Sequence, residues 1–271
     1  MWDSVWCLRK WDEGMRRNRS KVYRHIMEII IRHWRVSPYA ICFLMSFVCA
    51  YIYVALKLRK QGIIKRYIFY MMMLNTVLIL YFGLVYTVVT QLIQGNGIRE
   101  LGFSSLGGMM GMMLGVFIFS KISPDSKTAV FRENIKALGL MYSVSKLGCF
   151  FAGCCYGMKY DGPGKIRYVD PLAKTQSPWY FPVQLVESIC FLAAFLIINA
   201  ADRKPEISKA PQDSVSIEPI CIVTYSALKF ALDYLRYYPE RHIFTVNQWV
   251  CLMIIVLLIL SKVPRIIKDR Q

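Results

Sequence analysis

Seven long apolar runs divide this chain of 271 residues. Each run is about 18 to 27 residues long, which is enough for an α-helix to cross a hydrocarbon core of about 30 Å. The predicted spans are residues 38–56, 67–93, 101–120, 137–154, 183–201, 217–235 and 243–261. The sequence therefore predicts an all-α integral membrane protein with seven transmembrane helices, and it excludes most soluble classes.

The segments outside these runs are too short to fold independently, so we predict one transmembrane domain over residues 37–262. It includes an outer cap loop at residues 155–182, which is rich in Gly and Pro. Residues 1–36 form a basic, Trp-rich arm, and residues 263–271 a basic cytoplasmic tail. In the arm, apolar residues recur at helical spacing from Ser20, which predicts an interfacial helix on the bilayer surface. Packing of that helix on a partner or a neighbouring loop is the alternative.

The chain is strongly basic, with 34 Lys and Arg residues against 17 Asp and Glu, and a net charge of +17. Most of these cations lie in short loops beside apolar runs, so we expect a membrane partner and no nucleic acid. Loops after the first, third, fifth and seventh runs hold 16 cations, against 7 on the other side. The positive-inside rule then predicts a cytoplasmic C-terminus. Nine basic residues in the arm favour the opposite orientation, and we attribute them to the interfacial helix.

Two cations, Lys146 and Lys229, fall near the middle of predicted spans. A charged side chain at that depth costs about 2.5 to 3.5 kcal/mol, so it normally faces a protein interior or a wet cavity and has a partner. Asp233 and Arg236 follow Lys229 on one helical face, and Glu187 lies near the outer end of the fifth span. These five residues are the candidate polar site.

The candidate site has two explanations. It is either an ion-pair network that specifies helix packing, with Lys229–Asp233 and Lys146–Glu187 as pairs, or a binding site. Three cations against two carboxylates leave surplus positive charge, which suits an anionic ligand such as a phospholipid head group. We favour the binding site.

Two small-residue motifs are also open to more than one interpretation. Glycines recur every four residues from Gly107 in the third run, which indicates close helix packing or, alternatively, backbone that approaches a ligand. Cys149, Cys154 and Cys155 lie where the fourth run ends. Zinc is not expected there, because the three His residues lie elsewhere and no second thiol pair has ligand spacing. We favour small apolar fillers over a redox pair, and we expect no metal, no cofactor and no disulfide framework.

Several motifs, in order along the chain, resemble those of the prolipoprotein diacylglyceryl transferase family. Residues 146–157 are similar to the family signature Gly-Arg-x-Gly-Asn-Phe-x-Asn-Gly-Glu-x-x-Gly. Residues 182–187 are similar to the family motif Pro-x-Gln-Leu-Tyr-Glu, and residues 225–236 are similar to Tyr-x-x-x-Arg-Phe-x-x-Glu-x-x-Arg. Weaker matches are Leu106-Gly107-Gly108 to His-Gly-Gly, Asn247-Gln248 to Gly-Gln, and Tyr39-Ala40 to Tyr-Gly.

The resemblance implies a multi-pass enzyme of the bacterial plasma membrane. Its partners would be phosphatidylglycerol, or a related anionic phospholipid, and a cysteine-bearing lipoprotein precursor. The diacylglyceryl group would pass to the cysteine thiol, which needs cations on the phosphate and a base for the thiol proton. The resemblance implies catalytic roles for Lys146, Lys229, Asp233 and Tyr39. It implies substrate contacts for Gly107, Gly108, Gly148, Gly153, Cys154, Gln184, Glu187, Tyr225, Arg236 and Gln248.

The chain departs from the family pattern at several functional positions. Lys146 and Lys229 replace arginines and so supply charge without bidentate geometry. Leu106 replaces the histidine, Cys154 replaces the signature glutamate, and Asp233 replaces a glutamate. The base would then be Asp233, the Cys154 thiolate or one of two tyrosines, Tyr39 and Tyr225. A desolvated Lys146 that loses its proton is a further alternative, but it would bind phosphate poorly. The alternatives are a catalytically silent relative that binds anionic phospholipid or a precursor for a partner and, ranked last, a membrane thiol protein that uses Cys154 and Cys155.

Overall fold

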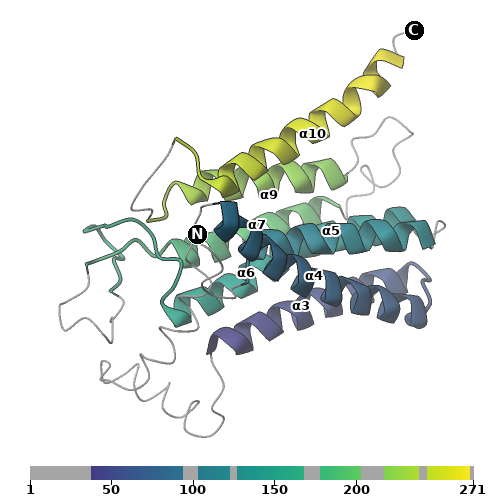
Figure 1. Cartoon of the computed structure of the whole chain (residues 1–271). Helices are drawn as coiled ribbons and strands as arrows, with labels where there is room; N and C mark the ends of the chain where they lie inside the picture. Colours follow the sequence, from purple (N-terminus) through teal and green to yellow (C-terminus); the bar gives the residue numbers. More distant parts are fainter. Residues whose placement is uncertain are drawn as a thin grey trace, which may run out of the picture.

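The structure is a computed structural model of the chain, described here over residues 38–93, 103–122, 127–167, 178–202, 217–237 and 243–268. These residues form seven α-helices and no β-strand (Figure 1). The helices are α3 (Pro38–Lys60), α4 (Lys65–Ile93), α5 (Ser105–Ile122), α6 (Lys127–Ala152), α7 (Val183–Ala201), α9 (Ile217–Asp233) and α10 (Val246–Lys268). One helix corresponds to each predicted span, in the same order.

Five of these helices, α3 to α7, are long and apolar enough to cross a membrane. Their outward faces carry large apolar side chains, such as Leu44, Ile189 and Ile197, which are 64%, 66% and 68% exposed. Such faces suit lipid, because an apolar surface of this extent is unusual in a water-soluble monomer. The chain therefore has the architecture of an α-helical membrane protein. The predicted arm at residues 1–36 lies outside the described residues.

Helix α6 begins earlier than the sequence predicted. The predicted fourth span began at residue 137, because Arg132, Glu133 and Lys136 interrupt the apolar pattern. The helix instead begins at Lys127, so Lys136 lies inside α6 and not in a loop. Its side chain is fully buried. The assignment of only Lys146 and Lys229 to span interiors was therefore wrong, since a third lysine is buried in this helix.

Lys136 is tolerated because carboxylates surround it. Its Nζ lies 2.8 Å from Glu133 and 2.5 Å from Asp202, at the end of α7, and Arg132 also pairs with Asp202. From α3, the Tyr53 hydroxyl donates to Glu133 at 3.0 Å. Two cations thus meet two carboxylates, and these four charged residues form a neutral group that we call the Lys136 cluster. It joins α3, α6 and α7.

Helix α6 is the centre of the bundle and packs against α3, α5, α7 and α9. Small residues allow the close approach. Ser143 and Ser188 each donate a hydrogen bond to the other's carbonyl, at 2.8 and 3.0 Å, which joins α6 to α7. A Cβ on Gly148 would lie 3.2 Å from the Tyr39 carbonyl of α3. The buried polar residues of α6, such as Ser143, therefore face protein rather than lipid.

The glycines of α5 pack against α4. A Cβ on Gly107 would lie 2.4 Å from the Phe82 carbonyl oxygen, and one on Gly111 would lie 2.2 Å from that of Leu78. Because these are backbone atoms, a side chain would push the helices apart. These contacts support the packing explanation for the repeated glycines.

Beyond α6, the described parts of the cap (residues 155–167 and 178–182) contain only isolated bridges (Figure 1). Gly157 pairs antiparallel with Arg236, and the Met158 amide donates to the Leu235 carbonyl at 2.8 Å. The Phe181 amide in turn donates to the Met158 carbonyl at 3.0 Å. The cap backbone therefore holds the segment that follows α9. We refer to this side of the bundle as the cap end.

Candidate functional site

Glu187 of α7 collects the three candidate cations, and its side chain is completely buried. Its carboxylate lies 3.2 Å from Lys146 Nζ of α6 and 3.1 Å from Lys229 Nζ of α9. Arg236 donates from Nη2 to both oxygens, at 2.8 and 3.2 Å. Residues from three helices and the cap-held segment therefore meet at one carboxylate.

Asp233 is the second carboxylate of the site. It lies 3.4 Å from Lys229 Nζ and 3.7 Å from Arg236 Nε. The Thr245 hydroxyl donates to its other oxygen at 2.5 Å. This contact ties the end of α9 to the start of α10. We call Lys146, Glu187, Lys229, Asp233 and Arg236 the Glu187 cluster.

Both pairs of the packing explanation are thus present, Lys146 with Glu187 and Lys229 with Asp233. These pairs do not balance the charges of the described residues, because three buried cations share two carboxylates. The five residues of the Glu187 cluster therefore sum to one positive charge, whereas the four of the Lys136 cluster, about 15 Å away along α6, sum to zero. Its excess cation gives the Glu187 cluster the electrostatics of an anion site.

Tyr142 is a residue that the sequence analysis missed. Its hydroxyl donates to Glu187 at 3.2 Å. The ammonium groups of Lys146 and Lys229 lie 5.0 and 5.8 Å from the centre of its ring, which is within cation–π range. The available signal was spacing, because Tyr142 precedes Lys146 by four residues and so lies on the same face of the helix.

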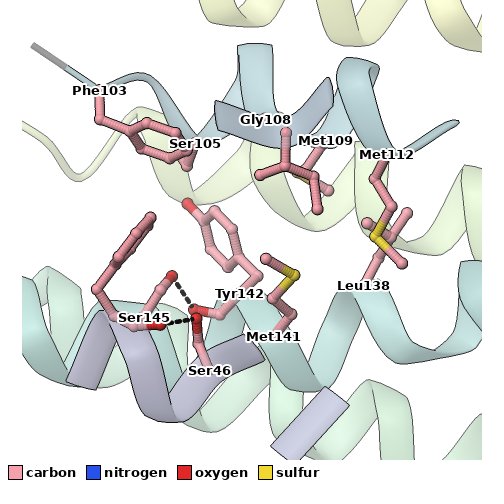
Figure 2. A pocket seen from close by; sticks show the side chains of 12 residues that line it. Ser46, Phe103, Ser105, Gly108, Met109, Met112, Leu138, Met141, Tyr142 and Ser145 are labelled. Atoms are coloured by element: carbon pink, nitrogen blue, oxygen red, sulfur yellow. Dashed lines mark hydrogen bonds between the residues drawn. The ribbon is translucent and has the colours of Figure 1, made fainter. Parts of the chain in front are cut away.

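Tyr142 also lines a small cavity of about 40 Å³ between α3, α4, α5 and α6 (Figure 2). Gly108 of α5 lines it too, so this glycine faces the cavity. Two of its polar side chains are engaged elsewhere, since Ser46 donates to the Phe43 carbonyl and Ser145 to the Tyr142 carbonyl (Figure 2). The cavity therefore presents a mainly apolar lining beside the Glu187 cluster.

Two residues proposed from the resemblance lie elsewhere. The Tyr225 hydroxyl donates to the Lys136 carbonyl at 3.0 Å. The side-chain oxygen of Gln248 accepts a hydrogen bond from the Thr245 backbone amide at 2.9 Å, and the backbone amide of Gln248 donates to the Thr245 hydroxyl at 3.2 Å. That reciprocal pair is a capping box at the start of α10. Gln248 also donates from its side-chain amide to the Phe230 carbonyl of α9 at 3.2 Å, so it supports the cluster through Thr245 and through α9.

Other candidates gather where α6 ends. Gln184 is fully buried and donates to the Cys154 carbonyl at 2.6 Å. Tyr39 packs on Cys149 and Cys154. Gly153 has a φ of 65°, so it turns the chain out of the helix. These residues shape the cap end beside Lys146. Leu106, at the position of the family's histidine, is buried.

Comparison with known sequences identifies the family. The family model described as prolipoprotein diacylglyceryl transferase matches residues 25–263. The chain belongs to this family. It is 21% identical to a phosphatidylglycerol–prolipoprotein diacylglyceryl transferase of Clostridium tetani, over 58% of this chain and 61% of the relative.

Other members are similarly distant. A second such transferase of Clostridium perfringens is 24% identical over 57% of this chain and 59% of its own length. One of Dehalococcoides mccartyi strain 195 is 28% identical over 39% of this chain and 42% of its own. The chain thus spans about three fifths or less of the length of these relatives.

Within this diacylglyceryl transferase family, the chain keeps positive charge but not residue type at two motif positions. The positions that resemble family arginines hold Lys146 and Lys229, and both contact one carboxylate. No histidine occurs among the described residues.

Proposed function

We propose that this protein binds the phosphate of an anionic phospholipid, such as phosphatidylglycerol, at the Glu187 cluster and transfers the diacylglyceryl group to a cysteine thiol of a lipoprotein precursor. The observation that carries the proposal is the meeting of three buried cations at the single Glu187 carboxylate, in a site whose described charged residues sum to one positive charge. A phosphate would complete the charge balance there, with the acyl chains on the lipid side.

In this reaction the thiol sulfur attacks the glyceryl carbon bonded to the phosphate oxygen. The C–S bond forms, the C–O bond breaks, and glycerol phosphate leaves with the bonding electrons. Lys146 and Lys229 stabilise the leaving phosphate. Asp233 receives the thiol proton in our proposal, because it lies within the Glu187 cluster, whereas Tyr225 bonds the Lys136 carbonyl.

A second candidate function is phospholipid or precursor binding without transfer. It is favoured by Leu106 and Cys154, which stand where the family has a histidine and a glutamate and are both buried. Purified protein, phosphatidylglycerol and a peptide with a lipoprotein cysteine motif would separate the two functions. Thioether formation on the peptide supports transfer, and retained phospholipid without a product supports binding alone.

Replacement of Lys146 tests the surplus charge. We expect Lys146→Ala to lower transfer, or phospholipid retention if there is no transfer, by about 100-fold, because a preorganised charge contact is lost. The fold should survive, since the remaining two cations and two carboxylates balance. Lys121→Ala is the matched control, because this exposed lysine also lies near an aromatic ring, that of Phe117 at 5.5 Å. Equal activities of the two variants would contradict the proposal.

Replacement of Tyr142 separates its ring from its hydroxyl. Tyr142→Phe removes only the hydrogen bond to Glu187, and we expect a loss of about fivefold. Tyr142→Leu also removes the ring beneath both lysines, and we expect a loss of about 30-fold, seen mainly as a higher KM for phospholipid. Tyr51→Phe, which loses a hydrogen bond to Thr76, is the control. Equal losses in the two Tyr142 variants would exclude a role for the ring.

We also propose that all seven helices span the bacterial plasma membrane, with the cap outside and the C-terminus in the cytoplasm. The loop charges support this orientation. It places the Glu187 cluster toward the outer surface, where a secreted precursor presents its cysteine.

A further inference from the structure

Tyr86 of α4 carries a buried hydroxyl group that has no hydrogen-bond partner among the described residues. About 90% or more of buried polar groups in proteins have such a partner, so this exception needs an explanation. The neighbouring hydroxyls on α4 do not supply one, because Thr87 and Thr90 both donate to carbonyls of their own helix, at 3.1 and 2.6 Å. The fold of the described residues therefore leaves the Tyr86 hydroxyl unused.

The position of Tyr86 directs attention to the Glu187 cluster. A Cβ on Gly107 of α5 would lie 2.5 Å from the Tyr86 Cβ, so the missing side chain of this glycine leaves room for the tyrosine. The Tyr86 hydroxyl lies within electrostatic range of Lys229 and Asp233, the two cluster residues that α9 supplies. Helix α4 itself packs mainly on α5 and, less closely, on α3. The side chain thus reaches from the α4–α5 pair toward the cluster.

Other uncharged polar groups of the candidate site are already engaged. Tyr142 donates to Glu187 at 3.2 Å, and Tyr225 donates to a backbone carbonyl of α6 at 3.0 Å. Cys154 is disulfide-bonded, although the sequence predicted no disulfide framework. Of these side chains and Tyr86, only Tyr86 keeps an unused hydroxyl.

The acceptor that Tyr86 lacks could come from an anion on Lys229. The oxygens of Asp233 are taken, because one faces Lys229 at 3.4 Å and the other accepts from Thr245 at 2.5 Å. Of the three cations in the cluster, Lys229 has the most exposed side chain, at 9%, and is therefore the most accessible to a ligand. A phosphate oxygen beside Lys229 would also accept a strong hydrogen bond, since it is charged.

We propose that the Tyr86 hydroxyl donates a hydrogen bond to a phosphate oxygen of the phospholipid bound at the Glu187 cluster, beside Lys229. The proposal rests on the proposed function, because it needs a phosphate at that cluster. It assigns to phospholipid binding a residue that lies outside every family motif found in the sequence. The hydroxyl is then satisfied only in the lipid-bound protein.

Tyr86→Phe tests this assignment in the full-length protein in detergent. Each preparation is incubated with phosphatidylglycerol at graded mole fractions and separated by size-exclusion chromatography, and the retained lipid is measured by mass spectrometry. We expect half-saturation of the variant to need about tenfold more lipid, because a hydrogen bond to a charged oxygen is lost. Without lipid, its thermal midpoint should equal that of the wild type or rise, because the substitution removes an unpartnered buried hydroxyl.

Tyr51→Phe is the matched control, because the Tyr51 hydroxyl contacts Thr76 at 2.8 Å and the Met72 carbonyl at 3.2 Å. It should show the opposite pattern, with a lower thermal midpoint and unchanged retention of phosphatidylglycerol. Diacylglycerol, which has no phosphate, is the control ligand, and its retention should be the same in the wild type and in Tyr86→Phe. Weaker retention of diacylglycerol by the variant would overturn the contact with phosphate.

Two further outcomes separate this assignment from the proposed function. If Lys146→Ala loses phosphatidylglycerol while Tyr86→Phe retains it as the wild type does, the assignment of Tyr86 is wrong and the proposed function stands. If the wild type itself retains no phosphatidylglycerol, the proposed function fails and the assignment fails with it. A fall of several degrees in the thermal midpoint of Tyr86→Phe would place the hydroxyl in the fold and would also overturn the assignment.

Discussion

Glu187→Gln is expected to destabilise the protein by about 3 to 5 kcal/mol, because it removes one partner of a buried ion cluster. Glu187 is completely buried and contacts Lys146, Lys229 and Arg236. Without its charge, the three buried cations of the Glu187 cluster keep one carboxylate of that cluster, Asp233. The thermal unfolding midpoint in detergent should fall by about 6 °C or more. A midpoint within about 1 °C of the wild type would show that the cluster does not support the fold.

A double variant tests whether the loss of stability comes from charge or from packing. Glu187→Gln combined with Lys146→Ala leaves two cations with one carboxylate, which restores the single surplus charge of the wild type. We expect this double variant to recover a clear part of the lost stability, although Lys146→Ala adds a small cavity. The two sites are in contact, so their effects should not be additive. Additive losses would place the destabilisation in packing and not in charge.

Lys136→Met is expected to cost a similar amount, about 3 to 5 kcal/mol, for the opposite electrostatic reason. Lys136 is fully buried between Glu133 and Asp202, so its loss leaves two carboxylates with Arg132 alone. Methionine matches much of the lysine stem, which keeps the lost packing small. The measurement is again the thermal midpoint in detergent.

Activity distinguishes the two clusters. The Lys136 cluster is neutral and about 15 Å along α6 from Lys146, so Lys136→Met should leave the activity per folded molecule within about twofold of the wild type. Adding Glu133→Gln rebalances the charges and should recover part of the stability. A large loss of activity in folded Lys136→Met would mean that this end of α6 also takes part in the reaction.

The helices were predictable because lipid imposes a simple rule on sequence. A span must be long and apolar, and each of the seven predicted spans corresponds to one helix. The rule failed at α6, where Arg132, Glu133 and Lys136 look like a loop. Only tertiary packing, which brings Asp202 from α7 to Lys136, makes a helix possible there.

The sequence predicted which charged residues form the site, but it did not predict how their side chains pair. Helical spacing placed Lys229 with Asp233, and the intramembrane cost of charge identified both lysines. That Glu187 would bind both lysines and Arg236 depends on how α6, α7 and α9 meet, which no spacing encodes. Gln248 shows the converse, because Thr245 three residues before it was a readable capping signal that the family motif obscured.

The backbone pairing of Gly157 with Arg236 has a mechanical consequence. Arg236 lies in the segment after α9, and this segment is hydrogen-bonded to the cap loop at Gly157 and Met158. Displacement of the cap loop would therefore also withdraw the Arg236 guanidinium group from Glu187. In the proposed function, an incoming precursor that displaced the loop would thereby expose the Glu187 carboxylate and weaken binding of the lipid phosphate. Binding of the acceptor polypeptide and release of glycerol phosphate would then depend on the same movement.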